Sequence, residues 1–156
     1  MTEDFREIRI ELKDNEWEYS YTDHDREIAR AIVFDDEGYL YFVRAQRDDD
    51  FGKAVLIETS GGGVEQNEAI EKALVRELKE ELGATARIIC KLGVVDDYYN
   101  LIHRHNINNY YLCKATSFGE NSLTEDEIEQ FHLSPLKLSF EEAVCEYERL
   151  KNTKVG

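Results

Sequence analysis

The sequence contains a single proline, no closely spaced cysteines and no long hydrophobic run. Because Pro135 stands alone, a proline-rich linker is excluded. The cysteines Cys90, Cys113 and Cys145 include no C-x-x-C pair, which argues against a zinc knuckle and a disulfide framework. No run approaches the length of a membrane span, and the N-terminal residues lack the apolar core of a signal peptide. We therefore expect a cytoplasmic protein without a membrane partner.

Basic residues are also scarce. Lys and Arg number 19 against 34 Asp and Glu, which gives a formal charge of −15 for 156 residues. This charge argues against nucleic-acid polymers and anionic membranes as partners, and it suits a site that recruits divalent cations. Hydrophobic residues make up 42% of the chain, a globular composition, and the length predicts one domain over residues 1–156.

Periodic patterns predict strands around one long helix. Alternating residues indicate a hairpin of residues 8–12 and 17–21, a second strand pair at 27–34 and 39–45, and strands at 54–59, 86–95 and 108–115. Apolar residues spaced i, i+4 predict a helix over 65–82, which Gly83 ends. A capping box at Ser139 and Glu142 begins a terminal helix over 139–152, and residues 124–133 are ambiguous. These elements predict a mixed α/β fold with layered helices.

Three glutamates gather on one face of the predicted long helix. At 100° per residue, Glu80 and Glu81 lie within about 60° and 40° of Glu77. The predicted helix that carries them follows a loop with glycines at residues 61–63. Crowded carboxylates raise one another's pKa unless a cation compensates, and Mg²⁺ prefers carboxylate oxygens. The pattern alone leaves two interpretations open, namely a divalent metal site and a glutamate-rich helix that faces solvent.

The spacing of the whole stretch matches the Nudix box, G-x5-E-x7-R-E-U-x-E-E-x-G-U, where U is a bulky aliphatic residue. The matching positions are Gly62, Glu68, Arg76, Glu77, Leu78, Glu80, Glu81 and Gly83, and only Ala84 departs from the pattern. The sequence therefore resembles the Nudix hydrolases, a family that includes MutT-like enzymes. The resemblance implies an α/β/α sandwich with a mixed β-sheet. It also implies that a metal-activated water cleaves a nucleoside diphosphate linked to another moiety, X.

The resemblance implies a cation site and a water nucleophile. Glu77, Glu80 and Glu81 would hold Mg²⁺ or Mn²⁺, and Gly61 would add its backbone carbonyl. The catalytic base is not implied, because family members differ. Glu77 could activate the water, or a later carboxylate could do so. The later candidates are Asp96, Asp97, Glu120, Glu125 and Glu127.

Other box residues are implied to be structural. Glu68 and Arg76 would form a salt bridge that braces the loop and helix, and Arg76 would also orient the glutamates. Gly62 and Gly83 belong to the same structural motif. Two flanking positions differ from the family, since Ser60 replaces a frequent proline and Asn67 a frequent glycine. Asn tolerates a left-handed conformation. We expect neither change to touch a metal ligand.

The box does not identify the substrate. We predict that Arg44 binds a terminal phosphate and that Tyr99 stacks on a base, although surface charge compensation and strand packing are alternative roles. The substrate class is a small nucleotide derivative whose moiety X stays open. A homodimer is also consistent with the family. The alternative function of another class is a non-catalytic Nudix-like domain that senses a nucleotide and regulates a partner.

Overall fold

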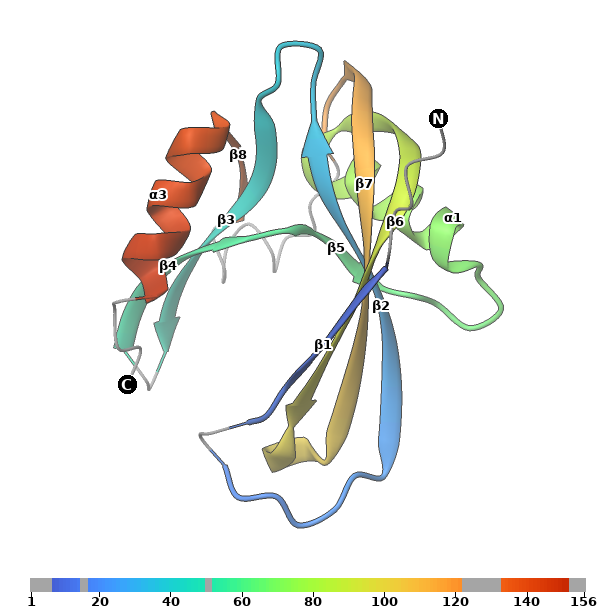
Figure 1. Ribbon diagram of the computed structural model, residues 1–156, viewed down its shortest axis with the longest axis vertical. Coiled ribbons are helices and arrows are strands. Elements are labelled where there is room, and N and C mark those ends of the chain that lie inside the picture. Colours follow the sequence, from blue (N-terminus) through green and yellow to red (C-terminus); the bar gives the residue numbers. More distant parts are fainter. Residues whose placement is uncertain (1–6, 15–16, 50–51, 122–132, 152–156) are drawn as a thin grey trace.

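A mixed β-sheet with a helix on each face forms the fold (Figure 1). The computed structural model describes residues 7–14, 17–49, 52–121 and 133–151. Its strands are β1 (Ile8–Leu12), β2 (His24–Phe34), β3 (Leu40–Asp49), β4 (Gly52–Glu58), β5 (Ser60–Gly63), β6 (Ala84–Tyr99), β7 (Arg104–Phe118) and β8 (Ser134–Leu138). The helices are α1 (Ile70–Leu82), the short 3-10 helix η1 (Asn100–Ile102) and α3 (Phe140–Lys151). None of these described helices is long and apolar enough to cross a membrane.

Two strands share the same edge of β2. The strand β3 pairs with its end, and the glycine-rich strand β5 pairs with its middle. The main path has the order β1-β6-β7-β2-β3-β4, while β5 pairs with β2 and β8 pairs with β3. β2 runs parallel to β7 along its whole length. Its antiparallel register with β3 covers only Val33 and Phe34, and β5 pairs instead with residues 28–31. The glycines therefore lie against the middle of β2, where β3 has separated from it.

Alternate residues of β2 belong to different layers, because successive side chains of a strand point to opposite faces. The face under α1 is closed to solvent by Ala29, Ala31, Val33, Leu74 and Leu78, all 0% exposed. Burial of each leucine contributes about 2 kcal/mol. The other face carries Arg30 and Ile32, which share a cavity with residues of α3. The expected α/β/α sandwich with a mixed sheet is confirmed.

Most predicted elements are confirmed, with shifted boundaries. The strand pair and the later strands fall on β2, β3, β4, β6 and β7, and α3 begins directly after Ser139, whose predicted capping box with Glu142 is present. Gly83 ends α1 with a left-handed φ of 66°. The helix begins at Ile70 and not at residue 65, because Asn67 has a φ of 64° and turns the chain before it. Most of the ambiguous segment, residues 122–132, lies outside the described residues.

The predicted hairpin of residues 8–12 and 17–21 is wrong. β1 instead pairs in parallel with β6, and the described residues 17–21 form no strand. Asn100 provides the physical reason. Its backbone N–H donates to the Asp14 carboxylate, and its side-chain amide donates to the Trp17 carbonyl, each at 3.0 Å. Asp14 and Trp17 are therefore both held against η1, and the described residues 17–21 do not pair with β1.

Candidate active site

Strand β5 and helix α1 hold the carboxylate of Glu81 between them. One oxygen, Oε1, accepts a hydrogen bond from the backbone N–H of Gly61 at 2.8 Å and another from the Ser60 hydroxyl at 2.9 Å. Ser60 is fully buried. The expectation that Ser60 touches no predicted metal ligand is therefore wrong, because β5 packs beside α1. The hydroxyl gives Glu81 a second donor that a proline in the same position could not supply.

Two glycines of β5 let other groups approach the strand closely. A Cβ on Gly62 would lie 2.5 Å from the carboxyl carbon of Glu77, so glycine leaves this carboxylate its place against the strand. A Cβ on Gly61 would collide with the carbonyl oxygen of Ala29, because β5 lies directly beside β2. The glycines thus bring the backbone of β5 against the glutamates of α1.

Arg76 connects the loop before α1 to the predicted metal ligands. Its Nε and Nη2 donate to the two oxygens of Glu68, each at 2.9 Å. Its Nη1 lies 3.0 Å from Glu77 Oε1 and 3.4 Å from Glu80 Oε2. The hydrogen bonds from Arg76 lower the pKa of Glu68 to about 2, so the pair is ionised at neutral pH. The predicted pair of Glu68 and Arg76 is therefore present, and Arg76 also compensates the crowded charge.

These residues fit a hard divalent cation in their chemistry. Carboxylate oxygens are the ligands that Mg²⁺ prefers, and Gly62 leaves a cradle that a Cβ would fill. Among the residues that the structure describes, no three His, Cys, Asp or Glu side chains have already gathered as a metal site. Arg76 instead donates to both Glu77 and Glu80. We therefore expect a cation to compete with the guanidinium for these two carboxylates.

Replacement of Ser60 by alanine should weaken divalent-cation binding. The change removes the hydroxyl donor to Glu81 and leaves the Gly61 N–H in place, so the carboxylate loses orientation while β5 stays paired. Partners that hold a metal ligand typically contribute 10- to 100-fold to affinity, and we expect a loss of about 10-fold. Mn²⁺ titration followed by electron paramagnetic resonance, without nucleotide, measures it. An unchanged Mn²⁺ affinity in a folded S60A variant would contradict this positioning role.

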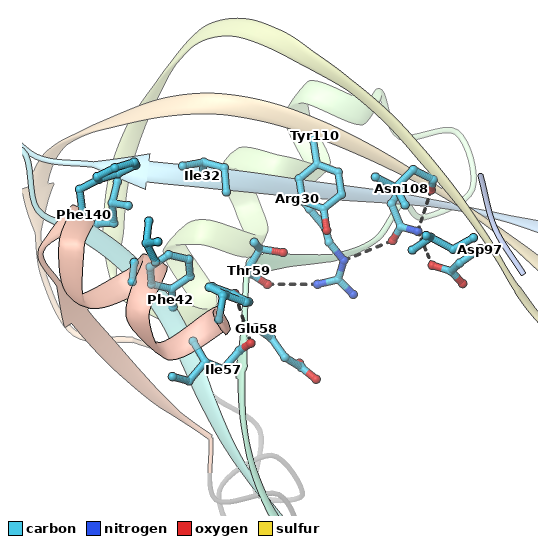
Figure 2. Close-up of a pocket in the computed structure, with 16 residues that line it drawn as sticks. Arg30, Ile32, Phe42, Ile57, Glu58, Thr59, Asp97, Asn108, Tyr110 and Phe140 are labelled. Atoms are coloured by element: carbon cyan, nitrogen blue, oxygen red, sulfur yellow. Dashed lines mark hydrogen bonds between the residues drawn. The ribbon is translucent and has the colours of Figure 1, made fainter. Parts of the chain in front are cut away.

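A cavity of about 560 Å³ lies on the other face of the sheet, below α3 (Figure 2). This volume is within the range of small-molecule sites. Its charged and polar lining residues are Arg30, Glu58, Thr59, Asp97 and Asn108, and its apolar and aromatic lining includes Ile32, Phe42, Ile57, Phe140 and Tyr147. Glu58 and Thr59 immediately precede β5, so the polar part of the cavity adjoins the glycine-rich strand.

Four polar side chains form a hydrogen-bonded chain across this face. Arg30 donates from Nη1 to the Thr59 carbonyl at 3.1 Å and from Nε to Asn108 Oδ1 at 3.3 Å (Figure 2). The Asn108 amide donates to Asp97 Oδ2 at 2.6 Å, and the Asn106 amide donates to Asp97 Oδ1 at 2.7 Å. These hydrogen bonds join β2, β6 and β7. They fix the guanidinium of Arg30 and the carboxylate of Asp97 at the cavity.

Arg44 and Tyr99, the predicted substrate-binding residues, lie outside the lining of this cavity. Arg44 is exposed on β3, two residues after the lining residue Phe42. Tyr99 is 40% exposed and ends β6, two residues after Asp97. Because residues two apart on a strand share a face, both extend the cavity side of the sheet. Their roles in substrate binding stay predictions.

Two of the later candidates for the catalytic base are engaged elsewhere. Asp96 is buried, which raises its pKa, but hydrogen bonds from Arg9 and His105 outweigh burial and lower it. Arg9 contacts both of its oxygens, at 2.7 and 3.0 Å. Asp97 accepts the hydrogen bonds from the side-chain amides of Asn106 and Asn108 described above. Glu120 is exposed, and Glu125 and Glu127 lie outside the described residues. Glu77 remains beside β5 as the candidate closest to the glycines.

The sequence interpretation missed Arg30, Asn108 and the cavity role of Asp97. One signal was available, because Arg30 interrupts an otherwise apolar strand, Ile28 to Phe34. A single arginine among alternating buried residues indicates a polar partner on the inward face. The partners themselves could not be named, because Asn108 is 78 residues from Arg30 in the chain.

Comparisons with known proteins agree with this geometry. The family model of the NUDIX domain matches residues 24–153. A NUDIX hydrolase from Nitrosomonas europaea has 16% identity and a TM-score of 0.62, covering 79% of this chain and 78% of its own. The ORF135 protein of E. coli has 27% identity and a TM-score of 0.51, covering 78% of each chain. A MutT NUDIX hydrolase from Burkholderia pseudomallei has 20% identity and a TM-score of 0.57, covering 75% and 84%.

No curated protein matches the sequence. The family match nevertheless spans most of the chain and contains the glycine-rich strand, the glutamate helix and nearly all of the cavity lining. The structural neighbours share the same mixed sheet with its two helical layers. The chain therefore belongs to the NUDIX family and is a hydrolase of the NUDIX pyrophosphatase type.

Proposed function

We propose that this hydrolase depends on Mg²⁺ or Mn²⁺ and cleaves the phosphoanhydride bond of a nucleoside diphosphate linked to another moiety, with water as the nucleophile. The observation that carries the proposal is the position of Glu81, whose carboxylate is fixed on β5 by Gly61 and Ser60. Glu77 lies against Gly62 in the same region. Carboxylates of a helix that lie beside a glycine-rich strand suit a cation that carries phosphate oxygens.

Each residue of the site has a distinct task in this proposal. Glu77, Glu80 and Glu81 would hold the cation, and Gly61 would add its carbonyl oxygen. The bound cation would neutralise the diphosphate and lower the pKa of the attacking water. Arg76 keeps Glu77 and Glu80 near each other by donating to both. Glu77 would accept the proton of the water, unless a carboxylate outside the described residues does so.

Arg26 supports the placement of the diphosphate along β5. Its guanidinium lies against Gly63, where a Cβ would be 2.5 Å from Nη2. The Arg26 side chain is exposed, and no hydrogen-bond partner is seen for it among the described residues. A guanidinium fork matches the oxygens of a phosphate. We therefore propose that Arg26 binds a phosphate of the substrate from the cavity side of the strand.

Hydrolysis of a nucleotide panel tests the proposed function. The panel contains nucleoside triphosphates, ADP-ribose, diadenosine polyphosphates and nucleotide sugars, each with Mg²⁺ or Mn²⁺ and each with EDTA. We expect turnover of at least one member with the cation and none with EDTA. Identification of both products, with the reaction run in ¹⁸O-labelled water, gives the phosphorus that water attacks.

The competing functions predict other results on the same panel. A nucleotide-sensing domain would show no turnover, while one nucleotide would raise the melting temperature. Turnover that persists in EDTA, with tightly bound metal excluded by elemental analysis, would contradict the assigned cation role. For glutamate variants of α1, E71Q is the matched control, because Glu71 is an exposed glutamate in the first turn of the same helix.

A further inference from the structure

We propose that the cavity below α3 binds a 6-oxopurine base of the guanine type, and that Arg30 determines this preference. The inference rests on the proposed function, because it assigns the nucleoside end of the same substrate to the cavity. It concerns the cavity side of β5 and not the glutamates of α1. The Arg30 side chain and the Asp97 carboxylate are both on this side, joined through Asn108 (Figure 2).

Arg30 is held in place and still has donors to offer. A guanidinium has five N–H groups. Its bonds to Asn108 and Thr59 use Nε and one N–H of Nη1, and no partner of Nη2 is found within the described part of the chain. The residue lines the cavity and is only partly buried. A fork that is fixed on one side and open on the other recognises a pair of adjacent acceptors.

Asp97, which is joined to Arg30 through Asn108, can accept further hydrogen bonds from a ligand. Asp97 accepts one amide on each carboxylate oxygen, from Asn106 and Asn108. An ionised carboxylate has about four acceptor sites, so two remain for ligand N–H groups. Glu58 adds a second carboxylate to the lining. The cavity thus presents one donor fork and two acceptor groups.

This combination of charges argues against a phosphate on Arg30. A phosphate there would stand beside the carboxylates of Asp97 and Glu58, and like charges at close range repel. Arg26 lies against Gly63 and does not line the cavity, so the proposed phosphate contact does not need Arg30. A neutral ring with both acceptors and donors matches the cavity better than an anion does.

Among the common bases, guanine matches the fork and the acids together. It carries two adjacent acceptors, O6 and N7, which arginine binds with two parallel hydrogen bonds, and it carries donors at N1 and N2 for a carboxylate. Adenine places an amino group beside N7, so one donor would face the guanidinium. Uracil has no adjacent pair of acceptors. Cytosine has such a pair but is smaller than the space below α3 suits.

The cavity walls suit a flat purine ring. Phe42 and Tyr147 contact each other edge to face, with ring centroids 5.7 Å apart, and both line the cavity. The Tyr147 hydroxyl donates to the Ile57 carbonyl at 3.2 Å. Burial raises the pKa of Tyr147 to about 12, so this wall stays uncharged. Apolar and aromatic side chains can cover the ring faces while Arg30 and Asp97 read its edge.

Calorimetric binding of GMP, IMP and AMP, in EDTA, tests the proposal without turnover. We expect GMP to bind about 10- to 100-fold more tightly than AMP, the usual discrimination of a two-bond contact. IMP lacks the amino group at N2 and should fall between them. The R30M variant should lose the preference for GMP over AMP. The R30K variant keeps the charge without the fork, so it should lose most of the preference even if R30M fails to fold.

The controls separate this inference from a phosphate role and from the proposed function. R87K changes an exposed arginine of β6 that does not line the cavity, and it should keep the preference. Equal binding of GMP and AMP by the wild type, no binding of either, or a preference that survives in R30K would overturn the inference. An equal loss of affinity for GMP, AMP and inorganic pyrophosphate in R30K would also overturn it, because that result would mean that Arg30 binds phosphate. Hydrolysis that does not depend on the base would support the proposed function and contradict this inference. A preference for GMP without hydrolysis of any panel member would support this inference and contradict the proposed function.

Discussion

Replacement of Glu81 by glutamine should abolish most hydrolysis and leave the fold intact. Glutamine keeps an oxygen that can accept the hydrogen bonds from Gly61 and Ser60, so the contact between β5 and α1 survives. The charge and one carboxylate ligand are lost. Since groups that only hold a metal ligand contribute 10- to 100-fold, we expect a proposed ligand to contribute at least about 100-fold to kcat. Steady-state hydrolysis of the best panel substrate, with Mg²⁺ at several concentrations, measures the loss.

The controls for this prediction separate charge from folding. E71Q removes a charge from the same helix, and it should hydrolyse at the wild-type rate. The melting temperature of E81Q in EDTA should stay close to that of the wild type, while its rise on adding Mn²⁺ should shrink. Wild-type turnover in E81Q would remove Glu81 from the proposed metal site.

Replacement of Arg76 by alanine should reduce stability and activity together. The guanidinium has hydrogen bonds to Glu68, Glu77 and Glu80, and its side chain is only 27% exposed. Its loss removes the counter-charge that Arg76 supplies to these three carboxylates. Because hydrogen bonds to charged groups contribute about 1.5 to 3 kcal/mol each when partly buried, we expect the free energy of unfolding to fall by about 2 kcal/mol. Urea denaturation at neutral pH measures this difference.

Glu68 gives the same variant a pH dependence. Hydrogen bonds from Arg76 hold the pKa of Glu68 at about 2, below its ordinary 4.5. Because the folded pKa is the lower one, the stabilisation is complete above about pH 4.5 and disappears as the pH falls through about 2. The difference in unfolding free energy between wild type and R76A should therefore be constant near neutrality and shrink in acid. A difference that is as large near pH 2 as at neutral pH would contradict this origin of the stability.

A conservative change at Arg76 distinguishes charge from geometry. R76K retains the positive charge, but one ammonium group cannot bind both oxygens of Glu68 and also reach Glu77. We expect R76K to recover part of the stability and little of the activity, because the glutamates lose their orientation. Added Mg²⁺ should raise the melting temperature of R76A more than that of the wild type, since the cation then meets less competition.

Local patterns predicted the helix, the strands and the pair of Glu68 and Arg76. The helical period places Leu74 and Leu78 on the buried face, and Gly83 ends the helix because it takes a left-handed conformation easily. Asn67 replaces a frequent glycine and has the left-handed φ that this position requires. Each of these features depends on neighbours within one or two turns of chain, so the sequence carries enough information to predict them.

Features that depend on sheet register were missed. The alternation of residues 8–12 indicates a strand but not its partner, and the strand pairs with β6, more than eighty residues later, through the register of Ile8 with Gly93. The contact of Ser60 with Glu81 also depends on how β5 packs against α1. No spacing rule relates these positions, because strand pairing is decided by the whole sheet.

The sequence by itself determined the family, the proposed cation ligands and the bracing salt bridge, since all of these lie in one continuous stretch from Gly61 to Gly83. Only the tertiary structure decided where the nucleoside end of a substrate could bind. Arg30, Asp97 and Asn108 come from three strands, and they meet because β2 pairs with β7 and β7 pairs with β6. A site assembled across a sheet depends on pairing between distant segments, which a linear pattern does not record.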